Sequence, residues 1–112
     1  MPRYLVSIHR PDGYDPDVED DAMALAIDTL NAQMGAAGVR VFVGGLQSPG
    51  KAVSLRPQSG GAVLASEGPY LRSGEHVGGF WVLEVASIYE AQTWGRKAAI
   101  ACRAPVEVRP FH

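Results

Sequence analysis

The stretch GGFWVLEV, residues 78–85, decides the fold of this chain. Its aromatic and β-branched residues favour a strand over a helix. Successive side chains of a strand point to opposite faces of a sheet, so the run Phe80–Leu83 is apolar on both faces. Both faces of the sheet that contains this strand therefore have to be shielded from water.

One helix is predicted before this strand and one after it. Asp15-Pro16 combines an N-cap residue with proline at the first helical position, and Gly38 supplies a left-handed cap at the other end. The apolar residues between them recur at the helical spacing i, i+4, i+7 and i+11: Met23, Ile27, Leu30 and Met34. The second helix begins with the capping box Ser87–Glu90 and extends to about Ile100.

The remaining segments predict further strands and one long loop. Alternating or β-branched residues indicate strands at Tyr4–His9, Val39–Val43, Ala52–Arg56, Ala62–Ala65 and Val106–Phe111. The turn residues between the third and fourth of these indicate a hairpin. Residues 66–79, SEGPYLRSGEHVGG, are predicted to form a Gly-rich loop.

The order of these elements indicates an α+β fold. A strand and a helix, a hairpin region, and then strand, helix and strand are typical of a ferredoxin-like antiparallel sheet with two helices on one face. Two helices cover only one face of such a sheet, and soluble monomers rarely expose a large apolar patch. A second copy of the chain is the simplest cover for the other face, so we expect a homodimer.

Length and composition limit the class of protein. The 112 residues match one domain, 46% of them are hydrophobic, and the net charge of −2 excludes a generally basic nucleic-acid binder. No apolar run approaches the roughly 20 residues of a membrane span, and the apolar stretch before His9 is too short for a signal peptide. We therefore expect a single domain over residues 1–112, no nucleic-acid or membrane partner, and a cytoplasmic location.

The sequence predicts no metal and no cofactor. The three histidines lack metal-binding spacing, and Cys102 is the single cysteine, which favours a small packed residue over a nucleophile. Seven acids lie in residues 1–40, around the predicted start of the first helix, where the helix dipole favours them. A cation or partner site at Asp15–Asp21 is the alternative for these acids.

The loop at residues 66–79 is the candidate ligand site. It holds acids, a phenol, a cation and an imidazole within ten residues: Glu67, Tyr70, Arg72, Glu75 and His76. Histidine titrates near neutral pH, so His76 is the candidate catalytic base and the other four are candidate ligand-binding residues. The alternative is a structural loop that covers a sheet end or a dimer seam.

Two residues on strands extend this candidate site. His9, at the end of the first strand, is a second candidate catalytic residue if the face that it shares with Ser7 lines a cleft. Arg109, on the last strand, is a candidate for holding a ligand carboxylate. The alternatives are a surface position for His9 and an ion pair of Arg109 with Glu84 or Glu107.

The loop and the strand after it also resemble a known family. Glu67-Gly68-Pro69-Tyr70 stands where the family has an Asp-Gly-Pro-Phe pattern, and Gly78-Gly79-Phe80-Trp81 follows at the spacing of its Gly-Gly-aromatic-aromatic pattern. Val106–Pro110 is similar to the family's final strand. On these residues the chain resembles the YCII-related family, in its DGPF-type branch, over nearly its whole length.

The resemblance implies a fold and a range of functions. It implies a ferredoxin-like α+β protein in a dimeric α/β barrel-like assembly, with a cleft near the sheet and loops. A few members are similar to dehydrochlorinating lyases, and some related members carry a proposed catalytic dyad of an acid and a histidine on the first helix. In this chain that helix position falls near Ile27 or Asp28, and no histidine lies in the predicted helix.

Two functions are compatible with these observations. One is a small cytosolic dimer that binds a small organic ligand and acts as an acid–base lyase or isomerase. The other is a non-catalytic dimeric binding or regulatory module. A catalyst requires His9 or His76 near a carboxylate and facing a pocket, whereas a binding module leaves both histidines free to lie in solvent.

Overall fold

A computed structural model describes all 112 residues. The strands are β1 (Arg3–Pro11), β2 (Arg40–Gly45), β3 (Val53–Pro57), β4 (Val63–Glu67), β5 (Glu75–Glu84) and β6 (Val106–Pro110). The helices are α1 (Asp21–Ala37) and α2 (Ile88–Cys102), and two short 3-10 turns are η1 (Pro16–Val18) and η2 (Pro49–Lys51). The predicted α+β class is confirmed.

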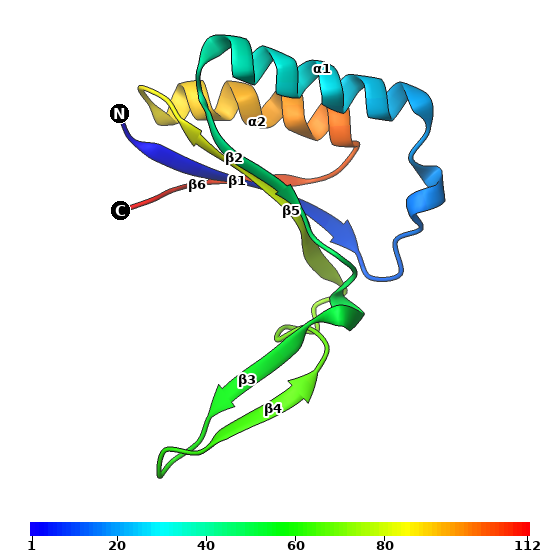
Figure 1. Cartoon of the computed structure of the whole chain (residues 1–112), viewed down its shortest axis with the longest axis vertical. Coiled ribbons are helices and arrows are strands. Elements are labelled where there is room, and N and C mark those ends of the chain that lie inside the picture. The colour runs from blue at the N-terminus through cyan, green and yellow to red at the C-terminus, as the bar shows by residue number, and fades with distance from the viewer.

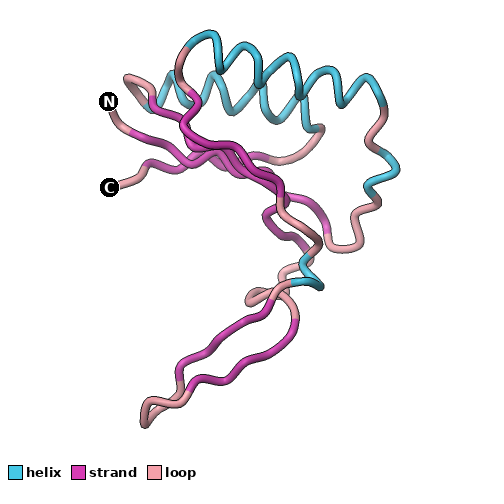
Figure 2. The backbone as a smooth tube through the Cα atoms, in the orientation of Figure 1, coloured by secondary structure: helices cyan, strands magenta, loops and turns pink.

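Four strands form an antiparallel sheet in the order β2-β5-β1-β6. Helices α1 and α2 lie side by side on one face of this sheet (Figure 1). β3 and β4 pair only with each other, in an antiparallel hairpin that projects away from the sheet (Figure 2). The sheet with two helices on one face and the hairpin both match the sequence analysis, which did not predict that the hairpin stands apart from the sheet.

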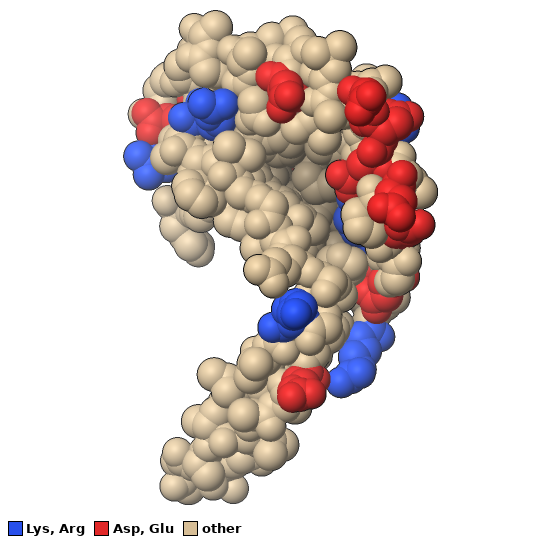
Figure 3. All heavy atoms as spheres, turned by 45° about the vertical axis from the view of Figure 1, so that its right-hand side comes forward, with Lys and Arg blue, Asp and Glu red and all other residues tan.

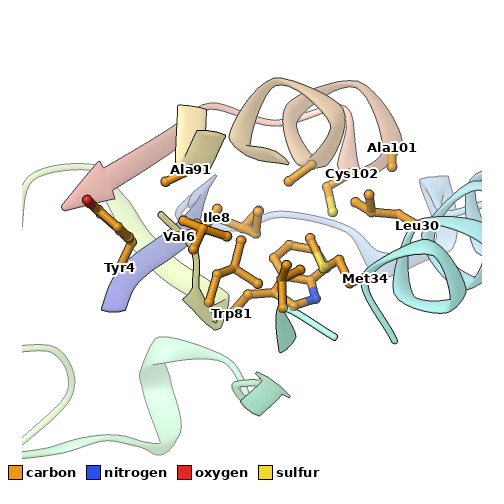
Figure 4. Packing of buried hydrophobic residues seen from close by; sticks show 13 residues of the cluster. Tyr4, Val6, Ile8, Leu30, Met34, Trp81, Ala91, Ala101 and Cys102 are labelled. Carbon is orange, nitrogen blue, oxygen red and sulfur yellow. The ribbon is translucent and has the colours of Figure 1, made fainter. Parts of the chain in front are cut away.

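The hydrophobic core lies between the helices and the sheet (Figure 4). Val6 and Leu83 are fully buried on the two central strands, and Met34 is fully buried on α1. The predicted stripe of the first helix is confirmed, because Met23 and Leu30 are buried with Met34 while Ile27 is partly buried. Neither helix of the structure is long and apolar enough to cross a membrane.

The first helix begins later than the sequence analysis predicts. Asp15 does act as an N-cap, but it caps the short turn η1, where its side chain accepts a hydrogen bond from the Asp17 amide. Asp20 caps α1 and accepts from the amide of Met23 at 2.8 Å. Two aspartate caps follow each other here, and α1 starts at the one that lies one turn before the first buried residue of the stripe.

The predicted loop at 66–79 is shorter than expected, because β5 already begins at Glu75. β1 continues to Pro11 and offers backbone partners for this added length: Arg10 pairs with His76, and the amide of Asp12 donates to the carbonyl of Gly74 at 2.8 Å. Glycines 78 and 79 are therefore strand residues, not loop residues. Glycine suits position 79, because a Cβ atom there would lie only 3.0 Å from the carbonyl oxygen of Gly44 on β2.

The burial of Leu83 gives a test of this core. We expect Leu83→Ala to lower the free energy of unfolding by about 2–5 kcal/mol, because the substitution leaves a cavity between sheet and helices. Leu25→Ala is the matched control, since Leu25 on α1 is 68% exposed and its loss is expected to change stability by no more than about 0.5 kcal/mol. Urea denaturation of both variants measures the difference, and equal losses would contradict the described packing.

Candidate functional site

A cavity of about 450 Å³ opens on the helix side of the sheet, at the end where β1 and β2 finish and β5 begins. It is enclosed by η1, the middle of α1, the sheet and the loop that follows β2. Figure 3 shows a hollow under the helices, bordered on one side by the acidic segment that leads into α1. A volume of this size suits a small organic molecule.

The cavity exists because the sheet carries almost no side chains at this corner. Gly44 and Gly45 of β2 lie beside Gly78 and Gly79 of β5, with Gly45 opposite Gly79. Gly45 and Gly79 belong to the helix-side face and have no Cβ atom, so the space above them stays open while η1 and α1 cover it. Gly44 faces the other way, since a Cβ atom there would meet the Phe42 ring. The Gly78-Gly79 pair of the Gly-Gly-aromatic-aromatic pattern therefore helps to shape the cavity wall.

Most of the cavity wall is apolar, with a few polar groups. Apolar groups come from the sheet and from both helices: Ile8, Val43, Trp81, Ile27 and Cys102. Asn31 of α1 accepts a hydrogen bond from the Trp81 indole nitrogen at 3.0 Å, and its amide donates to the carbonyl of Ile27. This network fixes the position of the indole in the wall.

His76 and Asp12 form the pair of residues that is best suited to acid–base chemistry. The imidazole Nδ1 lies 3.0 Å from a carboxylate oxygen of Asp12, with the His76 side chain 14% exposed and that of Asp12 44% exposed. An ionised carboxylate only accepts hydrogen bonds, so Nδ1 carries the proton that is shared with Asp12. Nε2 of His76 has no protein partner, and His76 lines the cavity.

A β-bulge turns His76 toward the cavity. Ile8 pairs with Gly79 but His9 pairs with Val77, so Gly78 is an extra residue in β5. Without it, the alternation of side chains would place His76 on the same face as Phe80, away from the helices. With it, His76 lies opposite Arg10 and shares the helix-side face with Ile8.

Arg10 and Tyr14 add two further polar groups to the wall. The Arg10 guanidinium carbon lies 4.3 Å from the centre of the Tyr14 ring, and the Tyr14 hydroxyl donates to Glu19 at 3.0 Å. Burial and the hydrogen bond to Glu19 raise the pKa of Tyr14. The phenol is therefore held neutral and fixed, and it serves as a platform for the guanidinium.

The structure does not bring His9 or Arg109 to this cavity. His9 lies on the opposite face of the sheet, where its Nε2 is 3.3 Å from the Ser7 hydroxyl. Arg109 pairs with Glu107 at 2.6 Å on the exposed surface of β6, which is one of the two ion pairs considered from the sequence. Glu84 is held instead by Arg3 at 3.0 Å.

The other candidate residues of the 66–79 segment are spread along the surface. Glu67 ends β4 in the projecting hairpin, and Glu75 is exposed at the start of β5. Tyr70 is 61% exposed and lies under the Arg56 guanidinium, 4.6 Å from the ring centre. Arg72 is exposed beside Gly68. Of this group the structure places His76 alone in the wall of the large cavity.

Sequence reasoning missed Arg10, Asp12 and Tyr14. One signal for Arg10 was present, because the alternation Tyr4, Val6, Ile8 continues to Arg10 on the core face of β1. No local signal linked Asp12 to His76, since 64 positions separate them and only the β1–β5 pairing brings them together.

Cys102, at the end of α2, reports on this cavity. Burial raises the pKa of its thiol, and the Arg10 charge offsets part of that increase. We expect Cys102 to react with iodoacetamide at pH 8 at least about tenfold more slowly than in the urea-unfolded chain, because the thiolate is the reactive form. Mass spectrometry follows the alkylation, and equal rates in both states would contradict the described burial.

Comparison with known proteins places the chain in a family. None of the curated proteins compared matches it. The model of the YCII-related domain matches residues 1–111, which includes every strand and helix described above. The match therefore covers the cavity, the His76–Asp12 pair and the projecting hairpin together. The chain belongs to the YCII-related domain family.

Proposed function

We propose that this protein binds a small organic ligand in the cavity and transfers a proton with His76, as a lyase or isomerase of acid–base type. The single observation that carries the proposal is the contact of His76 with Asp12 at the cavity wall. It meets the requirement set from the sequence, a histidine near a carboxylate and facing a pocket. The acid comes from the turn after β1, and the histidine comes from β5.

The pair acts as a base held in one tautomer. With the Nδ1 proton on the side of Asp12, the lone pair of Nε2 accepts a proton from the ligand. The Asp12 carboxylate then stabilises the imidazolium by its negative charge. An isomerase returns the proton to another atom of the ligand, and a lyase expels a leaving group together with the electron pair of the broken bond.

The alternative function is a non-catalytic dimeric binding or regulatory module. The observation that favours it is the projecting β3–β4 hairpin, whose outward apolar side chains include Val53, Leu55 and Val63. A two-stranded hairpin alone is marginally stable in water, so a partner surface fits this element better than solvent. Under this alternative the cavity holds an effector and His76 transfers no proton.

Removing the base separates the two functions. A thermal-shift screen of small organic molecules first identifies compounds that stabilise the native chain. We expect His76→Gln to keep binding of such a compound but to lower its turnover by roughly 10²–10⁴-fold, since the amide keeps polarity without acting as a base. Asp12→Asn is expected to lower turnover in the same direction, because it removes the charge that stabilises the imidazolium.

Tyr70→Ala is the control for this experiment. Tyr70 comes from the same segment as His76 but lies outside the cavity, so its loss is expected to leave binding and turnover unchanged. If His76→Gln converts a bound compound at the same rate as the parent chain, the proposal is wrong. Bound compounds that the parent chain never converts would favour the binding module.

We also propose that the protein is a homodimer in which the uncovered sheet faces meet, as in a dimeric barrel-like assembly. The face opposite the helices carries Leu5, Phe42, Phe80 and Val82, and the rings of Phe42 and Phe80 lie 5.8 Å apart. Phe42 is 55% exposed in the single chain. A twofold contact between two such faces buries these side chains at once in both copies.

We also propose, from the sequence, the branch of the family and the location of the protein in the cell. The Glu67-Gly68-Pro69-Tyr70 segment supports a place in the DGPF-type branch of the family. Its glycine keeps the left-handed conformation of a tight turn, with φ of 97°. The cytoplasmic location predicted from the sequence is the compartment in which we expect this activity.

The dimer has a direct test. Sedimentation equilibrium at micromolar concentration is expected to give twice the chain mass for the parent. Phe42→Asp is expected to shift the population to monomer, because it places a charge in the apolar contact. Tyr89→Asp is the control, since Tyr89 is exposed on α2, on the helix side of the sheet. A parent chain that sediments as a monomer at every concentration would overturn the dimer.

A further inference from the structure

The Arg10 guanidinium is a cation without an anionic partner in the chain. It takes part in none of the four ion pairs and donates no hydrogen bond to another residue. It is nevertheless only partly exposed and lines the cavity. Five N–H donors in a planar fork therefore stand free at the wall of a pocket sized for a small molecule.

The position of this guanidinium is fixed from two sides. Its central carbon lies over the Tyr14 ring, which Glu19 holds through the phenol hydroxyl. Its stem passes over Gly78, where a Cβ atom would lie only 2.9 Å from Arg10 Cγ. A guanidinium held this way has already lost much of its side-chain freedom, so less entropy is lost when it binds a ligand.

The pairing of β1 with β5 sets the distance between Arg10 and the proposed base. Arg10 and His76 are directly opposite each other on neighbouring antiparallel strands, and their side chains share one face. Side chains at such positions start about 4.5–5.5 Å apart at their Cβ atoms. A ligand that is bound by the guanidinium can therefore place an atom, a few bonds from the bound group, within reach of His76.

We infer that the ligand is a small organic acid whose carboxylate is held by Arg10. Its hydrocarbon body lies on the apolar wall formed by Ile27, Val43 and Trp81. The inference rests on the proposed function, because it assigns the ligand of the same cavity. A guanidinium fork and a carboxylate match in a bidentate pair, and the indole and aliphatic wall complements the rest of the molecule.

Glu19 decides between a carboxylate and a phosphate. Glu19 also lines the cavity, so the residues of the wall outside the His76–Asp12 pair carry one positive and one negative charge. A ligand with a single negative charge is repelled less by Glu19 than a phosphate dianion is. A monocarboxylate therefore fits this charge balance better.

The position of the bound carboxylate also determines which bond of the ligand lies near His76. The C–H bond that His76 breaks lies a few bonds from the carboxylate, at a carbon made acidic by a neighbouring carbonyl or double bond of the ligand. The proton moves to Nε2 and the electron pair moves into that neighbouring group. Return of the proton to a different carbon completes an isomerisation, and loss of a leaving group from the adjacent carbon completes an elimination.

Matched acid and amide pairs test the assignment. Probes are benzoate with benzamide and 4-oxopentanoate with its primary amide, and binding is measured by thermal shift and by protection of Cys102 from iodoacetamide. We expect the acids to bind the parent chain more tightly than the amides. Arg10→Met is expected to weaken acid binding by roughly 10- to 100-fold and to leave amide binding unchanged.

Three variants keep this test decisive. Arg72→Met is the matched control, because Arg72 is an exposed arginine outside the cavity, and its acid binding is expected to equal that of the parent. Gly78→Ala keeps every charge but adds a methyl group against the Arg10 stem, so acid binding is expected to fall even if Arg10→Met folds poorly. His76→Gln is expected to retain acid binding.

The outcomes separate this inference from the proposed function. If the amides protect Cys102 to the same degree as the acids, and Arg10→Met has no effect, the carboxylate assignment is wrong. The cavity would then still be a ligand site. Acids that bind in an Arg10-dependent way but are never converted support the assignment and contradict proton transfer by His76. Probes that stabilise the chain without protecting Cys102 place binding outside this cavity and overturn both.

Discussion

The antiparallel pairing of β1 with β5 is the contact on which the rest of the structure depends. These two strands form the centre of the sheet, and their helix-side residues Val6 and Leu83 are fully buried in the core. The pairing extends past the core to Pro11 and Glu75, where it brings together the turn after β1 and the start of β5. Core packing and the candidate site therefore share one ladder of hydrogen bonds, so damage at the core end also disturbs the position of His76.

One extra residue in that ladder separates the core from the site. On the C-terminal side of Gly78 in β5, the two strands alternate regularly and supply apolar side chains to the helices. On its N-terminal side, the shifted register places Arg10 and His76 on the helix-side face. A bulge is a local change in pairing that does not alter the strand order, so the fold can carry polar groups at this end while the core stays apolar. The glycines beside the bulge leave the space in which these polar groups meet a ligand.

Much of the fold could be predicted from residues close together in the sequence. The caps at Gly38 and Ser87, the Met23–Met34 stripe and the two-sided strand at Phe80–Leu83 express local preferences, and each appears in the structure. The site could be predicted only in part. His76 stood out by its chemistry, but its partner Asp12 and the neighbouring Arg10 depend on strand register, which a sequence pattern of alternating residues does not fix. The successive caps at Asp15 and Asp20 show the same limit, because both carry the same local signal and tertiary burial selects the second.

The two faces of β1 explain why the two histidines differ. Leu5, Ser7 and His9 lie on the face that the helices leave uncovered, whereas Ile8 and Arg10 lie on the face that leads into the cavity. A histidine at the end of this strand therefore belongs to the surface where a second copy is proposed to bind, and His76 of β5 belongs to the ligand cavity. Because the sheet stands between them, a change on one face alters assembly and a change on the other alters binding. Assembly and ligand chemistry are thus physically separable in this small domain, even though one pair of strands supports both.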